Sequence, residues 1–294
     1  MHKAGFVNIV GNPNVGKSTL MNALLGEKIS IATFKAQTTR HRIMGIYNEE
    51  EMQIVFSDTP GVLKPSYKLQ ESMLQFSESA LQDADVLLYV TDVVETAEKH
   101  NDFVEKVSKM DVPVIVLINK IDLSNQEKVV ALVEKWHEIL PQAEILPISA
   151  KNKFMVQNLM RRIKELIPES PAYFDKDQWT DRPARFFVSE ILREKILLYY
   201  DKEVPYSTEV VVESFKESDK VIHIHAVIYV ERDSQKGIII GHQGQALKKI
   251  SMEARKDLER FFSKKIYLET FVKVDTDWRN SDKELRNFGY DLSD

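Results

Sequence analysis

The sequence contains no cysteine and no long apolar run. The absence of cysteine excludes a disulfide framework and fits a reducing compartment. Every apolar run is far shorter than the ~20 residues that a membrane-spanning helix needs. Residues 1–10 run straight into a glycine-rich loop, so we expect no signal peptide. We therefore expect a cytoplasmic protein.

An excess of positive charge is also missing. The formal net charge is −5, which argues against a uniformly basic nucleic-acid-binding protein but leaves room for a local basic patch. The hydrophobic content of 43% is enough to build packed cores. A length of 294 residues suggests two domains at the usual ~100–200 residues each.

A glycine-rich loop near the start of the chain lies between a predicted strand and a predicted helix. The apolar run Phe6–Val10 precedes GNPNVGKS (Gly11–Ser18), and apolar residues at helical spacing follow it. This is the context that a phosphate-binding loop requires. Its amides and the helix N-terminus would point at phosphates. Lys17 would reach the β- and γ-phosphates, and the Ser18 hydroxyl would ligate Mg²⁺.

A second block, DTPG (Asp58–Gly61), follows the apolar run MQIVFS. Ligands bind beyond the carboxyl ends of strands in open α/β sheets. Asp58 is placed there to hold Mg²⁺ through water, and the Gly61 amide is free to approach the γ-phosphate. Taken alone, DTPG is equally compatible with an ordinary turn.

A third block, NKID (Asn119–Asp122), follows the continuous apolar run Val112–Ile118, which is typical of a buried parallel strand. The Asp122 carboxylate can accept hydrogen bonds from two N–H groups on guanine, whereas adenine offers no such pair. A site built for a polar partner rejects a base that leaves its own buried group unpaired. The block therefore favours GTP over ATP.

The first ~168 residues alternate between strand and helix patterns, which predicts an α/β domain with a mostly parallel sheet. Helices are predicted at Gln126–Leu140 and Lys153–Ile167. The predicted strands are Phe6–Val10, Arg42–Tyr47, Met52–Ser57, Val86–Thr91, Val112–Ile118 and Ile145–Ile148.

The pattern changes after Arg185. A helix, a two-stranded hairpin, a second helix and a last strand are predicted, in the order α-β-β-α-β. The predicted elements are the helix 186–200, the strands 207–215 and 220–231, a helix that follows Gly244, and the strand 264–274. A short final helix is expected within Trp278–Tyr290.

A G-x-x-G sequence, Gly241–Gly244, follows the apolar run Ile238–Ile240 and opens the second of these helices. In KH domains, such a loop clamps about four nucleotides of a single strand. The surrounding stretch Lys236–Lys265 carries eight Lys/Arg and three Asp/Glu, and this local positive charge suits phosphate contacts. The alternative is a solvated basic helix face.

The blocks resemble those of the translation-factor-related class of small GTPases. Within that resemblance, PISAK (Pro147–Lys151) matches the fifth motif, which lines the base. QTTRH (Gln37–His41) matches the first switch. Thr39 is then the second side-chain ligand of Mg²⁺, with Thr38 as the alternative.

Two positions bear on the hydrolytic rate. Val62 stands where Ras-type enzymes place a glutamine that orients water. Because valine cannot hydrogen-bond the nucleophile, we expect slow intrinsic hydrolysis. Relatives with asparagine at the position of Asn14 bind K⁺ where others place an arginine finger. The alternative is that Asn14 only stiffens the loop.

The whole chain resembles the bacterial ribosome-assembly GTPases, which join a Ras-like P-loop GTPase domain with a mostly parallel six-stranded sheet to an α+β type II KH domain. The resemblance implies a GTPase domain at 1–168, a linker at 169–184 and a KH domain with a C-terminal helix at 185–294. For the proline-containing stretch 167–185, a loop that caps the first domain is the alternative to a free linker.

This resemblance implies a GTP-hydrolysing switch that binds 16S rRNA near its 3′ end and assists assembly of the small (30S) ribosomal subunit. GTP/GDP and Mg²⁺ are the expected cofactors, with K⁺ as a further candidate. The alternative is a regulatory GTPase whose KH-like module binds a protein or a membrane surface. We expect a monomer, with peripheral association at the inner membrane as a further candidate.

The resemblance also implies the residues of each site. The catalytic residues are Lys17, Thr39 and Asn14. The Mg²⁺ ligands are Ser18, Thr39 and, through water, Asp58. The GTP contacts are Gly11, Asn12, Pro13, Asn14, Val15, Gly16, Lys17, Ser18, Thr19, Asp58, Thr59, Pro60, Gly61, Val62, Asn119, Lys120, Asp122, Ser149, Ala150 and Lys151. The RNA contacts are Gly241, His242, Gln243, Gly244, Lys248 and Lys249.

Overall fold

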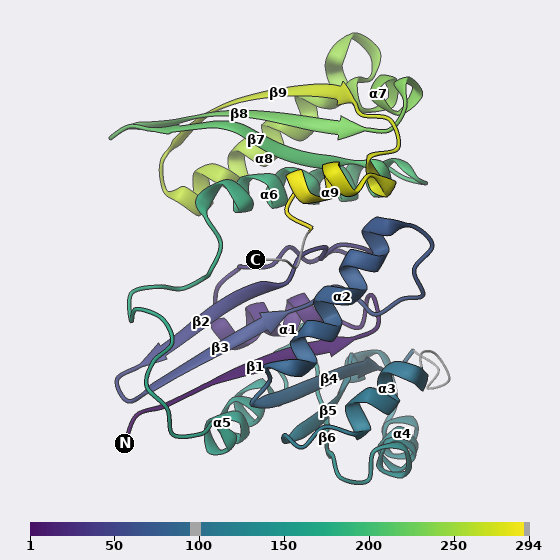
Figure 1. Cartoon of the computed structure of the whole chain (residues 1–294), viewed down its shortest axis with the longest axis vertical. Coiled ribbons are helices and arrows are strands. Elements are labelled where there is room, and N and C mark those ends of the chain that lie inside the picture. Colours follow the sequence, from purple (N-terminus) through teal and green to yellow (C-terminus); the bar gives the residue numbers. More distant parts are fainter. Residues whose placement is uncertain (95–100, 291–294) are drawn as a thin grey trace. The chain divides into compact units, whose positions relative to one another are not determined.

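The computed structural model describes residues 1–94 and 101–290, which fall into two compact units (Figure 1). One unit contains residues 1–66 and 70–181, and the other contains residues 182–290 with the short segment 67–69. Each unit is built on its own β-sheet.

The sheet of the first unit has six strands in the order β2-β3-β1-β4-β5-β6. The strands are β1 (Lys3–Gly11), β2 (Ile43–Glu49), β3 (Met52–Asp58), β4 (Val86–Asp92), β5 (Val114–Asn119) and β6 (Glu144–Pro147). Strand β2 runs antiparallel to β3, and the other neighbouring pairs are parallel. The predicted six-stranded, mostly parallel sheet is therefore confirmed.

Helices cover both faces of this sheet (Figure 1). They are α1 (Lys17–Leu25), α2 (Lys68–Gln82), α3 (Asn101–Ser108), α4 (Gln126–Ile139) and α5 (Val156–Leu166). On one face, Ala80 of α2, Val104 of α3 and Trp136 of α4 share a buried cluster with β4 and β5. Helices α1 and α5 contact each other on the other face. Burial on both faces explains why the central strands read as continuous apolar runs.

The chain after α5 lies along the outer strands of this sheet. The Gln53 side chain donates to the carbonyl of Phe174 at 2.8 Å and accepts from the amide of the same residue at 2.9 Å. Further along, the Ile46 amide donates to the Trp179 carbonyl at 3.0 Å. Of the two alternatives for the stretch 167–185, these contacts favour a loop that caps the first unit, as far as residue 181.

The second unit has a three-stranded sheet in the order β7-β8-β9, with helices packed on one face. Its elements are α6 (Ala184–Tyr199), β7 (Glu209–Glu217), β8 (Val221–Val230), α7 (Asp233–Ile240), α8 (Gln245–Phe262), β9 (Lys265–Val274) and α9 (Asp282–Asn287). Strand β8 pairs antiparallel with β7 and parallel with β9.

The predicted order of this unit was incomplete, because the structure has two helices between β8 and β9. The run Ile238–Ile240 forms the last turn of α7, and Ile239 is fully buried there. This helix has only eight residues, and Gly237 and three isoleucines lower its intrinsic helix propensity. The short final helix was predicted correctly as α9. It follows Trp278, a fully buried residue whose indole N–H donates to the Ser207 carbonyl at 3.1 Å.

Within the two described ranges, the structure contains no helix with the length and apolarity needed to cross a bilayer.

Candidate functional site

The three blocks meet at the carboxyl ends of the parallel strands, because β1, β3 and β5 end at Gly11, Asp58 and Asn119. In the glycine-rich loop, Gly16 has a φ of +98°, and a Cβ there would lie 2.3 Å from Nδ2 of Asn119. A side chain at this position would therefore break the contact between the first and third blocks. Lys17 opens α1 directly after this glycine.

The Lys17 ammonium lies over the glycine-rich loop. It donates to the carbonyls of Gly11 and Asn12 at 2.9 and 2.8 Å. These contacts hold a buried positive charge at the site where phosphates are expected. The loop therefore has the donors and the charge that a phosphate chain requires.

Three oxygen-bearing side chains converge beside this lysine. The Ser18 hydroxyl donates to Oδ2 of Asp58 at 2.6 Å and lies 2.9 Å from the Thr39 hydroxyl. Thr39 donates to the same carboxylate oxygen at 3.3 Å. Hard cations such as Mg²⁺ prefer oxygen ligands of this kind.

The Asp58 carboxylate is fully buried, and its Oδ1 accepts no hydrogen bond from the described residues. Burial raises the pKa of this carboxyl above its ordinary value, while the Ser18 hydroxyl, the Lys17 charge and the hydroxyls of Ser30 and Thr39 oppose the rise; Ser30 lies near the carboxyl without a hydrogen bond to Oδ1. A buried carboxylate oxygen without a donor is costly unless a cation balances it. The donor set therefore fits a bound Mg²⁺.

The two threonines of the first switch lie in different surroundings. Thr39 faces Ser18 and Asp58, as described above. The Thr38 hydroxyl donates to the Lys35 carbonyl at 2.6 Å and lies 2.7 Å from the Thr33 hydroxyl. Of the two candidates, the geometry favours Thr39 as a metal ligand.

The base-recognition blocks are linked to each other and to the glycine-rich loop. Asn119 donates to the Val15 carbonyl at 2.8 Å and accepts from the Ala150 amide at 3.0 Å. The Ser149 hydroxyl donates to Oδ1 of Asp122 at 2.6 Å, and the exposed Asp122 is thereby oriented. The predicted third and fifth motifs are thus brought together, with Lys151 exposed beside them.

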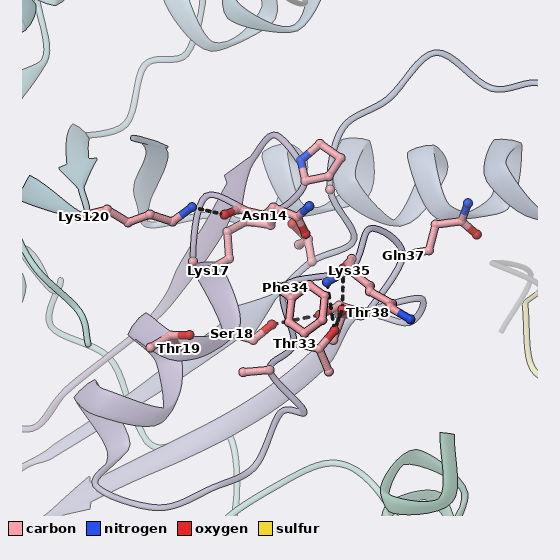
Figure 2. Close-up of a pocket in the computed structure, with 16 residues that line it drawn as sticks. Asn14, Lys17, Ser18, Thr19, Thr33, Phe34, Lys35, Gln37, Thr38 and Lys120 are labelled. Atoms are coloured by element: carbon pink, nitrogen blue, oxygen red, sulfur yellow. Dashed lines mark hydrogen bonds between the residues drawn. The ribbon is translucent and has the colours of Figure 1, made fainter. Parts of the chain in front are cut away.

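One pocket joins the glycine-rich loop to the first switch (Figure 2). From the predicted contacts, its lining includes Pro13, Asn14, Gly16, Lys17, Ser18, Thr19, Thr39, Thr59, Gly61 and Lys120. It also includes switch residues that the prediction of contacts missed, namely Ala32, Thr33, Phe34, Lys35 and Gln37, together with the alternative ligand Thr38. Phe34 is 75% exposed. An aromatic residue three positions before the predicted first switch was a sequence signal for a further contact at the nucleotide site.

Val62 does not point into this pocket. Its side chain is buried in the cluster shared by α2, β4 and α3, and its amide donates to the Gly11 carbonyl at 3.1 Å. Val62 thus connects the start of the glycine-rich loop to the buried core. The other predicted GTP contacts are not part of the lining of this pocket, namely Gly11, Asn12, Val15, Asp58, Pro60, Val62, Asn119, Asp122, Ser149, Ala150 and Lys151.

The G-x-x-G loop of the second unit connects α7 to α8. Gly241 has a φ of +72°, and a Cβ there would lie 2.5 Å from Cβ of Ala246. His242 and Gln243 are exposed at the tip of the loop, and Lys248 and Lys249 are exposed on the first turns of α8.

A groove runs from this loop between α8 and β9. It is lined by Gly244, Leu247, Lys248, Ser251, Met252, Arg255, Leu268 and Thr270. The hydroxyls of Ser251 on α8 and Thr270 on β9 lie 2.8 Å apart and link the two elements within the groove. The sequence did not identify the contribution of β9, because only the fold brings that strand next to α8.

Comparison with known proteins gives full-length matches. The family described as "50S ribosome-binding GTPase" matches residues 6–120, and the family described as "KH domain" matches residues 203–279. GTPase Era of Clostridium kluyveri is 44% identical over 292 residues, covering 99% of this chain and 100% of the relative.

Solved structures agree. The chain matches a crystal structure of Era in complex with MgGDPNP and nucleotides 1506–1542 of 16S ribosomal RNA, with a TM-score of 0.94 and 40% identity. It matches a variant of Aquifex aeolicus Era bound to GDP and AlF4⁻ with a TM-score of 0.94 and 41% identity. Each match covers 99% of this chain and 100% of the other. The fold class and the resemblance predicted from the sequence are confirmed.

Proposed function

This chain belongs to the Era family of GTPases, and we propose that it is a GTP-driven switch that binds 16S rRNA near its 3′ end and assists assembly of the small ribosomal subunit. As a member of this family it hydrolyses GTP. The observation that carries the RNA part is the full-length match to an Era structure in complex with nucleotides 1506–1542 of 16S rRNA.

We propose that the phosphates of GTP lie on the glycine-rich loop and that Mg²⁺ is held by Ser18, Thr39 and, through water, Asp58. The bound metal would neutralise charge on the β- and γ-phosphate oxygens. The Lys17 ammonium would exchange its two carbonyl contacts for phosphate oxygens. Asn119 and Asp122 would select guanine. These roles are supported by the buried oxygen cluster and by the hydrogen bonds that join the blocks.

We propose a slow intrinsic reaction. The Val62 side chain is packed in the core, so it supplies no group that orients water. Asn14 has a φ of +65° and lines the pocket, which supports it as the candidate side chain for a K⁺ ion.

The RNA strand would run from Gly241–Gly244 along the groove between α8 and β9. The exposed Lys248 and Lys249 supply phosphate contacts, and the loop amides of the exposed His242 and Gln243 approach the backbone. The GTPase domain at 1–168 and the KH domain at 185–294 would divide these two tasks. The place of action would be the cytoplasm, where ribosomal subunits form.

Binding of a labelled 16S rRNA 3′-end fragment, measured by fluorescence anisotropy, tests this assignment. Gly241→Asp should weaken binding at least tenfold and leave GTP hydrolysis unchanged. Gly237→Asp is the matched control: it adds the same charge one turn earlier, at an exposed glycine where a Cβ meets nothing within 4 Å. Equal affinity of the two variants would refute the clamp. If the protein binds anionic lipid vesicles and does not bind the RNA fragment, the membrane-binding alternative is favoured.

A further inference from the structure

Asp92 is the last residue of β4, beside the guanine-recognition loop, and no motif includes it. It lies opposite Asn119 in the register of β4 and β5. Its side chain is 7% exposed, and Oδ2 accepts a hydrogen bond from Nζ of Lys120 at 2.6 Å. Oδ1 accepts from the Val94 amide at 2.9 Å. The carboxylate is therefore fixed by its own strand end and directed at the lysine.

The same lysine reaches the glycine-rich loop. Nζ of Lys120 donates to the Asn14 carbonyl at 2.5 Å, as Figure 2 shows. Both residues have left-handed backbone conformations, with φ of +59° for Lys120 and +65° for Asn14. One ammonium thus joins a buried carboxylate to a strained point of the phosphate loop.

The chemistry of lysine makes the carboxylate necessary for this arrangement. A lysine side chain is a point charge on a flexible stem, so it samples many rotamers unless a partner selects one. A charge-assisted hydrogen bond is shorter and stronger than a neutral one, and the low exposure of Asp92 limits its screening. Ordering a loop before the ligand arrives removes an entropic cost from binding.

We propose that Asp92 is a positioning residue for nucleotide binding. It holds Lys120 against the Asn14 carbonyl, so that the guanine loop and the phosphate loop receive the nucleotide as one preformed unit. This inference rests on the proposed nucleotide site and deepens it, because it assigns a role to a residue outside every motif.

The variant Asp92→Asn removes the charge while its amide oxygen can still accept from the Val94 amide. Dissociation of a fluorescent GDP, followed by stopped flow, should become about tenfold faster, which corresponds to about 1.4 kcal/mol. Hydrolysis at saturating GTP should stay within about twofold, because Lys120 contacts the backbone carbonyl of Asn14, whereas the K⁺ proposal concerns the Asn14 side chain. Glu144→Gln is the matched control, since Glu144 of β6 carries an equal charge in an exposed ion pair with Arg162 of α5. It should leave GDP dissociation unchanged.

A double-mutant cycle with Lys120→Met separates positioning from a general structural effect. If Asp92 acts through the lysine, Asp92→Asn should change GDP dissociation less than twofold in the Lys120→Met background. If Asp92→Asn accelerates GDP dissociation equally in both backgrounds, the inference is overturned. It is also overturned if Asp92→Asn lowers the unfolding temperature of the ligand-free protein but leaves GDP dissociation unchanged. If the Lys17→Ala variant binds GDP as tightly as the wild type, the proposed nucleotide site on the glycine-rich loop is itself overturned.

Discussion

Replacement of Asp58 by asparagine should have opposite effects on the ligand-free and the ligand-bound protein. The fully buried carboxylate receives the Ser18 hydroxyl on Oδ2, whereas Oδ1 accepts no hydrogen bond from the described residues. Asparagine keeps the shape and one acceptor oxygen and removes the buried charge. The ligand-free variant should therefore be more stable than the wild type at neutral pH, although it loses the proposed metal site.

The magnitude follows from the buried negative charge. Leaving a buried polar group uncompensated costs about 1–3 kcal/mol, and more for a charged one; the nearby Lys17 charge offsets part of this cost, so a gain of about 1–2 kcal/mol is expected. For a unit of this size, that is a rise of ~2–8 °C in unfolding temperature. In the wild type, GDP and Mg²⁺ at 100 times the dissociation constant add about 2.7 kcal/mol, which the variant should largely lose.

The pH dependence gives the sharper test. Because the pKa of Asp58 is raised in the folded state, the folded protein holds this proton to higher pH than the unfolded chain. Wild-type stability relative to the variant is thus greatest below the ordinary aspartate pKa of about 3.9. It then falls as pH rises through the raised value. Thermal unfolding of both proteins, followed by circular dichroism across pH 4–8, measures the difference. A constant difference, or a less stable variant at neutral pH, would refute the account of the buried carboxylate.

Three other predictions concern the glycine-rich loop and the buried tryptophan of the second unit. Gly16→Ala should weaken GDP binding at least tenfold in equilibrium titration, because its Cβ would lie 2.3 Å from the Asn119 side chain; wild-type affinity would contradict this. Hydrolysis should be several-fold faster in KCl than in NaCl, and Asn14→Ala should abolish the difference; equal wild-type rates in the two salts would rule out the ion. Trp278→Ala should destabilise the second unit by about 3–5 kcal/mol, measured by hydrogen exchange, since the indole is fully buried. GDP affinity should not change, and its loss would show that the effect is not local.

The sequence was sufficient for the parts of the molecule that local chemistry dictates. The runs that became β1, β3 and β5 are apolar because both faces of the sheet are covered, and each ends in a polar block. The six strands and the meeting of the three blocks could therefore be predicted. Helix α7 could not, because Gly237 and a run of isoleucines obscure its helical pattern.

The roles that were missed depend on tertiary neighbours. Asp92 is an ordinary strand-end residue until the register of β4 and β5 brings it within 2.6 Å of the Lys120 ammonium. The choice between Thr38 and Thr39 likewise needed the position of Asp58, which is distant in sequence. The capping of the first unit by residues 169–181 depended on the buried amide of Gln53.

The capping segment has a further consequence for association. Strand β2 lies at an edge of its sheet, where unpaired amides and carbonyls would accept a strand from another chain. Here Thr180 forms a bridge with Gly45, and the Asp181 carboxylate accepts from the Met44 amide at 3.0 Å. A fragment ending at residue 168 would leave that edge open to self-association, whereas one ending at residue 181 would carry its own cover. The residues that end the first unit thereby also protect it from aggregation through the β2 edge of its sheet.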